Sequence, residues 1–191
     1  MLFSQNEGIE DKTFVVTGGL GFVGSYLCLD LVRRGARQVR AFDLRPTSPW
    51  SVDLKNHGVH CIQGDVARKK DVDKALHGAD CVFHLASYGM SGKEMVQFGR
   101  VDEEIVNGNE SLPFFPVDDH VDPYGRSKSI AEWLVLKHNA RPFKKNNGKC
   151  LFTCAIRPAA IYGPGEERHF PEDCIPCQVR ASAFQKLVIQ T

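Results

Sequence analysis

The sequence predicts an α/β fold built on a parallel sheet, and three observations lead to that prediction. Short apolar runs typical of buried strands alternate along the chain with segments that have the spacing of amphipathic helices. A glycine-rich turn joins the first apolar run directly to the first helical segment. The second apolar run ends in a carboxylate, Asp43. Because helical crossovers join parallel strands, this alternation predicts a doubly wound sheet with helices on both faces.

Each element follows from a local pattern. The predicted strands are the apolar runs at residues 13–17, 38–43, 59–63 and 80–86. The first two predicted helices cover residues 26 to about 34 and residues 69–77. A further helix is expected from Pro123, with Asp122 as its cap and Ala131, Leu134 and Val135 as a core-facing stripe. Residues 46–58, rich in Pro, Ser and Asn, are predicted to form a loop over the ligand edge.

The composition is that of an ordinary globular domain. The chain has 191 residues, of which 42% are hydrophobic and 25% charged. Its formal net charge of +1 gives no reason to expect nucleic acid as a partner. Acidic residues near the N-terminus stand where a signal peptide would be basic, and no apolar run has the length of a membrane span. We therefore expect a cytoplasmic chain.

The seven cysteines mostly lie in apolar runs, which fits buried thiols in a reducing compartment. Cys174 and Cys177 have the spacing of a redox or zinc motif, but no second pair accompanies them. The sequence therefore predicts no metal site.

The run Thr17-Gly18-Gly19-Leu20-Gly21-Phe22-Val23-Gly24 predicts a phosphate-binding turn. Gly18 would permit the tight turn, Gly21 would let the backbone approach a pyrophosphate, and Gly24 would let the helix lie close to the strand. The helix N-terminus adds N–H groups and a positive dipole. A dinucleotide is the expected ligand, although a glycine-rich turn can also serve only to connect two elements.

Other strand ends carry residues that suit the rest of a dinucleotide. Asp43 would accept hydrogen bonds from the adenosine ribose and would repel a 2′-phosphate, which favours NAD. Arg45 could neutralise such a phosphate, so NADP remains open. Asp65 is expected either to receive the adenine amino group or to cap the next helix. The small residues Ala86 and Ser87 follow the fourth strand, where the nicotinamide half would pass the sheet edge.

Tyr124 and Lys128 are separated by one helical turn, so one helix face presents both side chains. The ammonium group would stabilise the phenolate of Tyr124, which could then take the proton of an alcohol during hydride transfer. Lys128 would also hold the nicotinamide ribose. The alternative is an amphipathic helix in which the tyrosine packs and the lysine extends to solvent.

Together these motifs resemble the extended short-chain dehydrogenase/reductase superfamily. The run from Arg157 to Gly165 is similar to the 3β-hydroxysteroid dehydrogenase/isomerase branch, and the run from Cys81 to Gly92 resembles family 42E within it. The resemblance implies a Rossmann fold and NAD-dependent oxidation of a steroid 3β-hydroxyl, with double-bond isomerisation left open. It also leaves open a homodimer and, for full-length relatives, association with the endoplasmic reticulum membrane. The expected cofactor-binding residues are Gly18, Gly21, Phe22, Val23, Gly24, Asp43, Asp65, Val66, Ala86, Ser87 and Lys128, with Tyr124 and Lys128 catalytic.

The sequence departs from the family pattern in two places. A tail at residues 1–11 precedes the predicted NAD(P)-binding domain at residues 12–173. Near residues 91–111 this domain has an internal gap. The family has one helix segment there and a fifth strand that ends in a catalytic Ser or Thr, and the chain has too few residues for them. The tail at residues 174–191 no longer resembles the family, and a C-terminal substrate lobe is expected to be absent. This pattern suggests a truncated or alternatively spliced product, and an incorrect gene model would look the same.

Three alternatives to a steroid dehydrogenase follow from these departures. A catalytically silent NAD-binding or interaction protein would keep the glycine turn and Asp43. A non-functional fragment would keep neither binding nor stability. A nucleotide-sugar epimerase or dehydratase would share the glycine turn and the Tyr124–Lys128 pair.

Overall fold

The computed structural model describes residues 6–87, 117, 123–143, 149–158, 161 and 163–166. These residues belong to two units. The first contains residues 6–87 with 164–166, and the second contains the described residues from 117 to 163. The four-stranded sheet lies in the first unit, and the helix that carries Tyr124 lies in the second.

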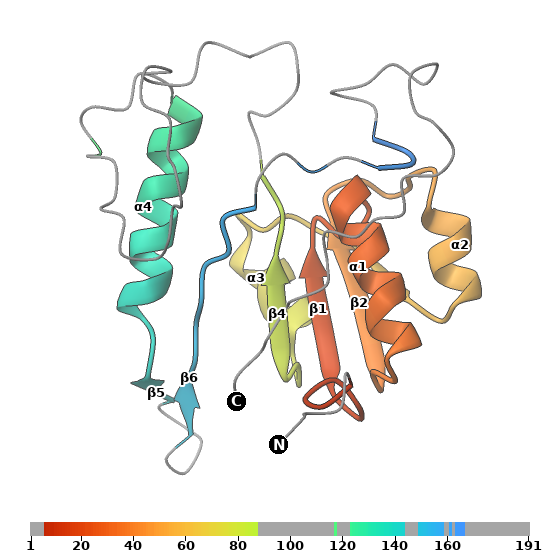
Figure 1. Cartoon of the computed structure of the whole chain (residues 1–191), viewed down its shortest axis with the longest axis horizontal. Helices are drawn as coiled ribbons and strands as arrows, with labels where there is room; N and C mark the ends of the chain where they lie inside the picture. Colours follow the sequence, from red (N-terminus) through yellow and green to blue (C-terminus); the bar gives the residue numbers. More distant parts are fainter. Residues whose placement is uncertain are drawn as a thin grey trace. The chain divides into compact units, whose positions relative to one another are not determined.

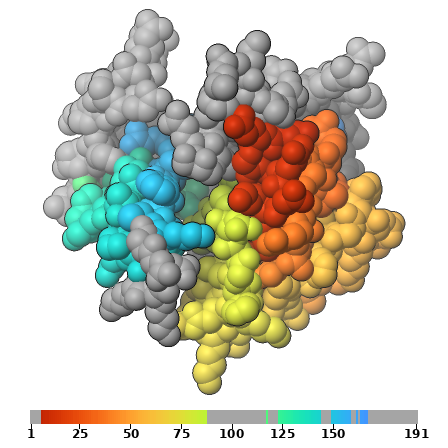
Figure 2. Space-filling model, turned by 90° about the horizontal axis from the view of Figure 1, so that it is seen from below, coloured from red at the N-terminus to blue at the C-terminus, as the bar shows by residue number. Residues whose placement is uncertain are grey.

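The first unit is an α/β structure on a parallel sheet (Figure 1). Its strands pair in the order β3-β2-β1-β4, and every pairing is parallel. In space-filling view its residues, coloured red to yellow-green, form one continuous body (Figure 2). The Rossmann-like class predicted from the sequence is therefore confirmed. In chain order the elements are β1 (Thr13–Thr17), α1 (Phe22–Arg33), β2 (Gln38–Asp43), α2 (Ser51–Asn56), β3 (His60–Gln63), α3 (Lys69–Leu76) and β4 (Cys81–His84).

Helices cover both faces of this sheet because successive strand residues point to opposite sides. Phe14 and Val16 of β1 pack in one core cluster with Leu27 and Leu31 of α1. Val15, between them, packs in a second cluster with residues of β2 and α3. All five residues of β1 are buried, as expected of a central strand with helices on each side.

The loop predicted at residues 46–58 is wrong, because Ser51–Asn56 form helix α2. Leu54 has no exposed surface and anchors the helix in the core. Ser51 is also buried, and its hydroxyl oxygen accepts the backbone N–H of Ser48 at 2.7 Å. A single buried leucine and a local serine bond thus outweigh the turn-forming composition of the segment.

The second unit contains α4 (Pro123–Lys137) and the antiparallel pair β5 (Arg141–Pro142) and β6 (Cys150–Leu151). The core-facing stripe predicted for α4 is wrong. No residue of this helix is buried, and Leu134 and Val135 are 44% and 39% exposed. The described residues of this unit supply only a two-residue strand pair, which is too small to cover a helix face.

Several predictions concern parts of the chain outside the described residues. These are the gap near 91–111, the cap Asp122, the tail at 174–191 and the pair Cys174 and Cys177. Within the described part of the chain, no helix is both long and apolar enough to cross a membrane.

Replacing Gly24 by alanine tests the contact between α1 and the glycine turn. A Cβ at Gly24 would lie 2.2 Å from the carbonyl oxygen of Gly18, which is a backbone clash. We expect Gly24→Ala to destabilise the protein by about 1–3 kcal/mol in urea unfolding. Helix propensity alone predicts that alanine raises the free energy of unfolding, by about 1 kcal/mol. An increase in stability would therefore contradict the close contact between Gly24 and the carbonyl oxygen of Gly18.

The buried thiol of Cys28 predicts a pH dependence of stability. Burial raises the pKa of Cys28 from 9.0 to about 12, with a smaller contribution from Cys61. The folded chain therefore holds this proton more tightly than the unfolded chain, and its stabilising effect is complete below pH 9.0 and lost toward about 12. The slope from this group is at most about 1.4 kcal/mol per pH unit.

Urea unfolding of the wild type and Cys28→Ala across this pH range measures the effect. The wild type should lose stability faster than the variant above about pH 9. Parallel curves for the two proteins would show that Cys28 does not titrate as its burial requires.

Candidate functional site

The predicted cofactor residues of the first unit meet at one edge of the sheet. Thr17, the last residue of β1, is in register with Phe42 of β2 and with His84 of β4. All the strands are parallel, so their carboxyl ends share this edge. The strand order also reverses here, because β2 and β3 lie on one side of β1 and β4 lies on the other. Ligands of open α/β sheets bind at such a reversal point.

The glycine turn has the geometry that close packing requires. Gly18 has a φ of +68°, and a Cβ there would lie 2.9 Å from the backbone nitrogen of Ala86. Its N–H donates to the carbonyl of Phe42 at 2.8 Å. Helix α1 begins at Phe22, directly after Gly21. The first N–H groups of a helix have no intrahelical acceptor, so the turn directs donors and a positive dipole to this edge.

Asp43 lies against the glycine turn and is only 9% exposed. Its Oδ2 accepts the backbone N–H of Leu20 at 3.1 Å, and its Oδ1 accepts the backbone N–H of Arg45 at 3.0 Å. The bond to Leu20 fixes the carboxylate beside the turn, where a nucleotide ribose would lie. The sequence predicted Asp43 at the end of its strand but gave no sign of the bond to Leu20.

The guanidinium group of Arg45 forms an ion pair with the Asp43 carboxylate. Its Nε lies 3.6 Å from Oδ1 of Asp43, and its Nη2 donates to the carbonyl oxygen of Leu20 at 3.1 Å. The Arg45 side chain is 55% exposed, so solvent weakens the ion pair. The guanidinium group therefore connects the end of β2 to the glycine turn from the solvent side.

The carboxylate of Asp65 stabilises the turn that precedes α3. Its Oδ1 accepts the N–H of Ala67 at 2.8 Å, and its Oδ2 lies 3.9 Å from Nε of Arg68. Helix α3 follows Arg68 at the N-cap position and has no side-chain cap, so the capping alternative for Asp65 is wrong. The adenine contact of Asp65 and the exposed Val66 remains a prediction.

A hydrogen-bond network that the sequence did not indicate joins β1 to β4. The Oγ1 of Thr17 accepts the N–H of Ala86 at 3.2 Å and shares a hydrogen bond with Nδ1 of His84 at 2.8 Å. Thr17 is buried, whereas Ser87 is exposed. The network holds Ala86 next to Gly18, so it shapes the edge at the reversal point. Only the pairing of β1 with β4 brings these residues together, and local sequence carries no signal for that pairing.

Tyr124 and Lys128 share one face of α4, as their spacing predicts. The Nζ of Lys128 lies 5.3 Å from the centre of the Tyr124 ring. Desolvation lowers the pKa of Lys128 below its ordinary value of 10.5. Because desolvation disfavours the charged ammonium, Lys128 would gain from an anionic neighbour such as a tyrosinate. The structure thus brings the two side chains together on one helix face, and their role in proton transfer remains a prediction.

The same helix carries an ion pair that the sequence did not reveal. Nε of Arg157 lies 3.1 Å and 3.0 Å from the two carboxylate oxygens of Glu132, and its Nη2 lies 2.8 Å from Oε1. These bonds raise the pKa of Arg157. The hydroxyl of Thr153 adds a bond to the carbonyl of Val135 at 2.9 Å. Together they fasten residues 149–158 to α4.

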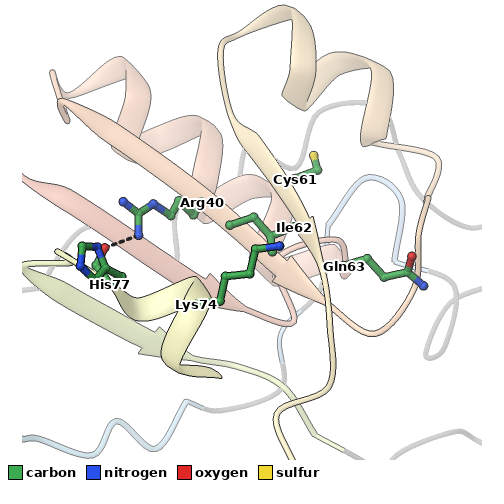
Figure 3. Close-up of a pocket in the computed structure, with 6 residues that line it drawn as sticks. All are labelled: Arg40, Cys61, Ile62, Gln63, Lys74 and His77. Atoms are coloured by element: carbon green, nitrogen blue, oxygen red, sulfur yellow. Dashed lines mark hydrogen bonds between the residues drawn. The ribbon is translucent and has the colours of Figure 1, made fainter. Parts of the chain in front are cut away.

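A cavity of about 410 Å³ lies beside β3 and the end of α3 (Figure 3). Arg40, which lines this cavity, already donates hydrogen bonds to other protein groups. Nη1 of Arg40 donates to the carbonyl oxygens of Ala75 and His77 at 2.9 Å and 2.7 Å. Its Nε and Nη2 donate to Gln38. Arg40 therefore caps the C-terminal end of α3, and none of the predicted cofactor or catalytic residues lines the cavity. The cavity is lined by Arg40, Cys61, Ile62, Gln63, Lys74 and His77.

Comparison with known proteins identifies relatives that match more than four fifths of this chain. The short-chain dehydrogenase/reductase family 42E member 1 of Danio rerio is 38% identical over 196 residues, covering 85% of this chain and 49% of the relative. The 3 beta-hydroxysteroid dehydrogenase type 7 of Homo sapiens is 33% identical over 194 residues, covering 81% of this chain and 51% of the relative. The chain thus spans about half the length of the curated relatives it matches.

Solved structures and a family model complete the comparison. The terminal R domain of the myxalamid biosynthetic pathway superposes with a TM-score of 0.48, at 18% identity over 67% of this chain and 46% of that chain. The fold assignment rests on the strand order instead. The 3-beta hydroxysteroid dehydrogenase/isomerase family model matches residues 15–103 and 91–186. The chain belongs to this family, in the short-chain dehydrogenase/reductase superfamily.

Proposed function

We propose that this chain binds NAD and belongs to an oxidoreductase that acts on the CH–OH group of a steroid, at a 3β-hydroxyl. The observation that carries the proposal is the bond between the Asp43 carboxylate and the N–H of Leu20, which sets a ribose acceptor beside the glycine turn. The names of the relatives supply the substrate class, since one is a 3 beta-hydroxysteroid dehydrogenase. Isomerisation of the steroid double bond is a further step within this proposal.

The residues at the sheet edge fit a dinucleotide. Gly18 and Gly24 leave no room for a Cβ, so the backbone itself forms the surface that a pyrophosphate would meet. The first turn of α1 would donate N–H groups to the phosphates, and Asp43 would accept the ribose hydroxyls. The carboxylate of Asp43 disfavours a 2′-phosphate, which supports NAD as the main cofactor.

Bound NAD would accept the hydride from the carbon that carries the hydroxyl. Tyr124 would take the hydroxyl proton at its phenolate oxygen, so that the alcohol becomes a ketone. Lys128 would stabilise the phenolate and hold the nicotinamide ribose. Ala86 and Ser87, at the end of β4, would line the path of the nicotinamide half.

A second candidate function is nucleotide binding without catalysis. The family model matches in two stretches that overlap at residues 91–103, and the 196-residue match to the Danio rerio relative is longer than the 85% of this chain that it covers. Both observations support an internal gap near 91–111, where the family has a helix and a strand with a catalytic hydroxyl. A chain without them would bind NAD but would oxidise alcohols slowly.

Thermal unfolding with and without NAD tests the cofactor. A ligand at 100 times its Kd stabilises the folded state by about 2.7 kcal/mol, so saturating NAD should raise the Tm. Asp43→Asn should weaken NAD binding by about ten-fold or more, since it removes a charged acceptor. Asp73→Asn is the control, because Asp73 is an exposed carboxylate on α3. Equal NAD affinity in the two variants would contradict the role of Asp43.

Tyr124→Phe separates catalysis from binding. The variant should keep its Tm shift with NAD and lose NADH formation from a 3β-hydroxysteroid by about 100-fold or more, because general acid–base catalysis contributes at least that much. The matched control is Tyr26→Phe, which removes a hydroxyl that donates to the carbonyl of Pro164 at 2.9 Å. If the wild type binds NAD but forms no NADH, binding without catalysis is the function of this chain. Activity that survives Tyr124→Phe would exclude Tyr124 as the base.

A further inference from the structure

Strand β3 lies at one side of the four-stranded sheet, and half of its backbone groups face away from that sheet. Among the described residues it pairs with β2 alone. In a parallel pair, the N–H and C=O groups of every second residue point to the neighbouring strand. The N–H of Gly64 donates to the carbonyl of Asp43 at 2.9 Å, so Gly64 and Ile62 face β2. The N–H and C=O groups of Cys61 and Gln63 therefore point outward.

The cavity beside β3 lies along this outward side, because Cys61 and Gln63 are both among the residues that line it (Figure 3). Within the described part of the chain, no group bonds to their outward N–H and C=O groups. An exposed strand edge of this kind is a template with which another extended segment can pair. The cavity, of about 410 Å³, leaves space for such a segment.

The other polar residues give the cavity a positive charge. Lys74 and His77 are exposed at the end of α3, and the described residues that line the cavity include no carboxylate. The Arg40 side chain donates to the carbonyl oxygens of Ala75 and His77 and to the amide oxygen of Gln38. None of these acceptors carries a charge, so the charge of Arg40 remains. The cavity therefore favours an acidic partner.

The cationic groups lie on one face of the sheet. Ile62 packs in the core cluster that includes Ala75 of α3, whereas Cys61 packs against the cluster on the opposite face. Lys74 lies beside Ile62, on the α3 face (Figure 3). Successive side chains of an added strand would point to opposite faces. Carboxylates at every second position of that strand would therefore all meet the cationic face.

A second copy of this chain fits the same edge less well. Symmetric pairing of two β3 strands would bring identical surfaces together, because an isologous contact uses the same patch on both copies. Arg40 and Lys74 of one copy would then face the same residues of the other. Juxtaposed like charges disfavour such a contact, so the charge of the cavity favours an acidic partner over self-association.

We propose that the outward side of β3 and its cavity form a docking site for an extended acidic segment of another protein, which adds to the sheet as a further strand. The main-chain groups of Cys61 and Gln63 supply the hydrogen bonds, and Lys74 and Arg40 select carboxylates at alternate positions. The site is separate from the proposed function, since none of the predicted cofactor or catalytic residues lines the cavity.

Titration calorimetry on the full chain with the capped peptide Thr-Glu-Val-Glu-Val-Thr tests the proposal. The wild type should bind this peptide. It should bind the matched peptide Thr-Lys-Val-Lys-Val-Thr about ten-fold or more weakly, because lysines would meet a cationic face. Two methylated forms of the acidic peptide, with N-methyl groups on both glutamates or on both valines, test for strand pairing. Only one form should lose about ten-fold or more, because alternate N–H groups of an added strand face β3.

Two pairs of protein variants locate the site. Gln63→Pro removes an outward N–H but no bond to β2, so it should weaken binding by about ten-fold, whereas Gln63→Ala keeps the N–H and should bind as the wild type does. Lys74→Gln should weaken binding by about three-fold. Its control is Lys70→Gln, which makes the same change on α3 outside the lining of the cavity and should have no effect.

Each contrary result overturns the proposal. Equal binding of the acidic and basic peptides would exclude the charge selection, and equal affinity of the two methylated forms would exclude strand pairing even if Gln63→Pro lowers the Tm. A wild type that binds neither peptide would exclude the docking site. If the wild type also dimerises in sedimentation experiments and Gln63→Pro does not, a second copy occupies this side of β3 instead.

Discussion

The close approach of the glycine turn to its neighbours is the constraint on which the rest of the first unit depends. Gly18 lies against the backbone of Ala86, and the first turn of α1 lies against Gly18 through Gly24. No side chain fits at either contact. The central strand, the start of α1 and the end of β4 are therefore fixed together, and the helix N-terminus faces the edge where all the strands end.

Two hydrogen-bonding centres complete this edge, one on each side of the turn. Asp43 joins β2 to the turn through Leu20, and Thr17 joins β1 to β4 through Ala86 and His84. The same bonds that stabilise the edge also orient the Asp43 carboxylate and the backbone of the turn, the groups proposed to meet a dinucleotide. Under the proposed function, structural support and ligand recognition would use the same atoms, so a change at either centre would alter both.

The second unit carries the residues proposed for proton transfer, but no residue of its helix α4 is buried. Tyr124 and Lys128 are aligned by helix geometry, and the bonds between Arg157 and Glu132 hold the following segment to the helix. The apolar residues of α4 remain exposed because the described part of this unit offers only the short β5–β6 pair, which is too small to cover them. The residues proposed to bind the nucleotide and those proposed to catalyse therefore lie mostly in different units, so each function needs its own experiment.

Local sequence determined the class of the fold, the order of its strands and helices along the chain, the turn at Gly18 and the shared face of Tyr124 and Lys128, because each depends on neighbours a few residues away. It failed for α2, where burial of Leu54 overrides a loop-like composition. Only the tertiary structure decided that Arg45 returns to the glycine turn, that Thr17 meets His84, and that Asp65 does not cap α3. The first two contacts join residues that are far apart in the sequence, and strand pairing and packing alone decide which distant residues meet.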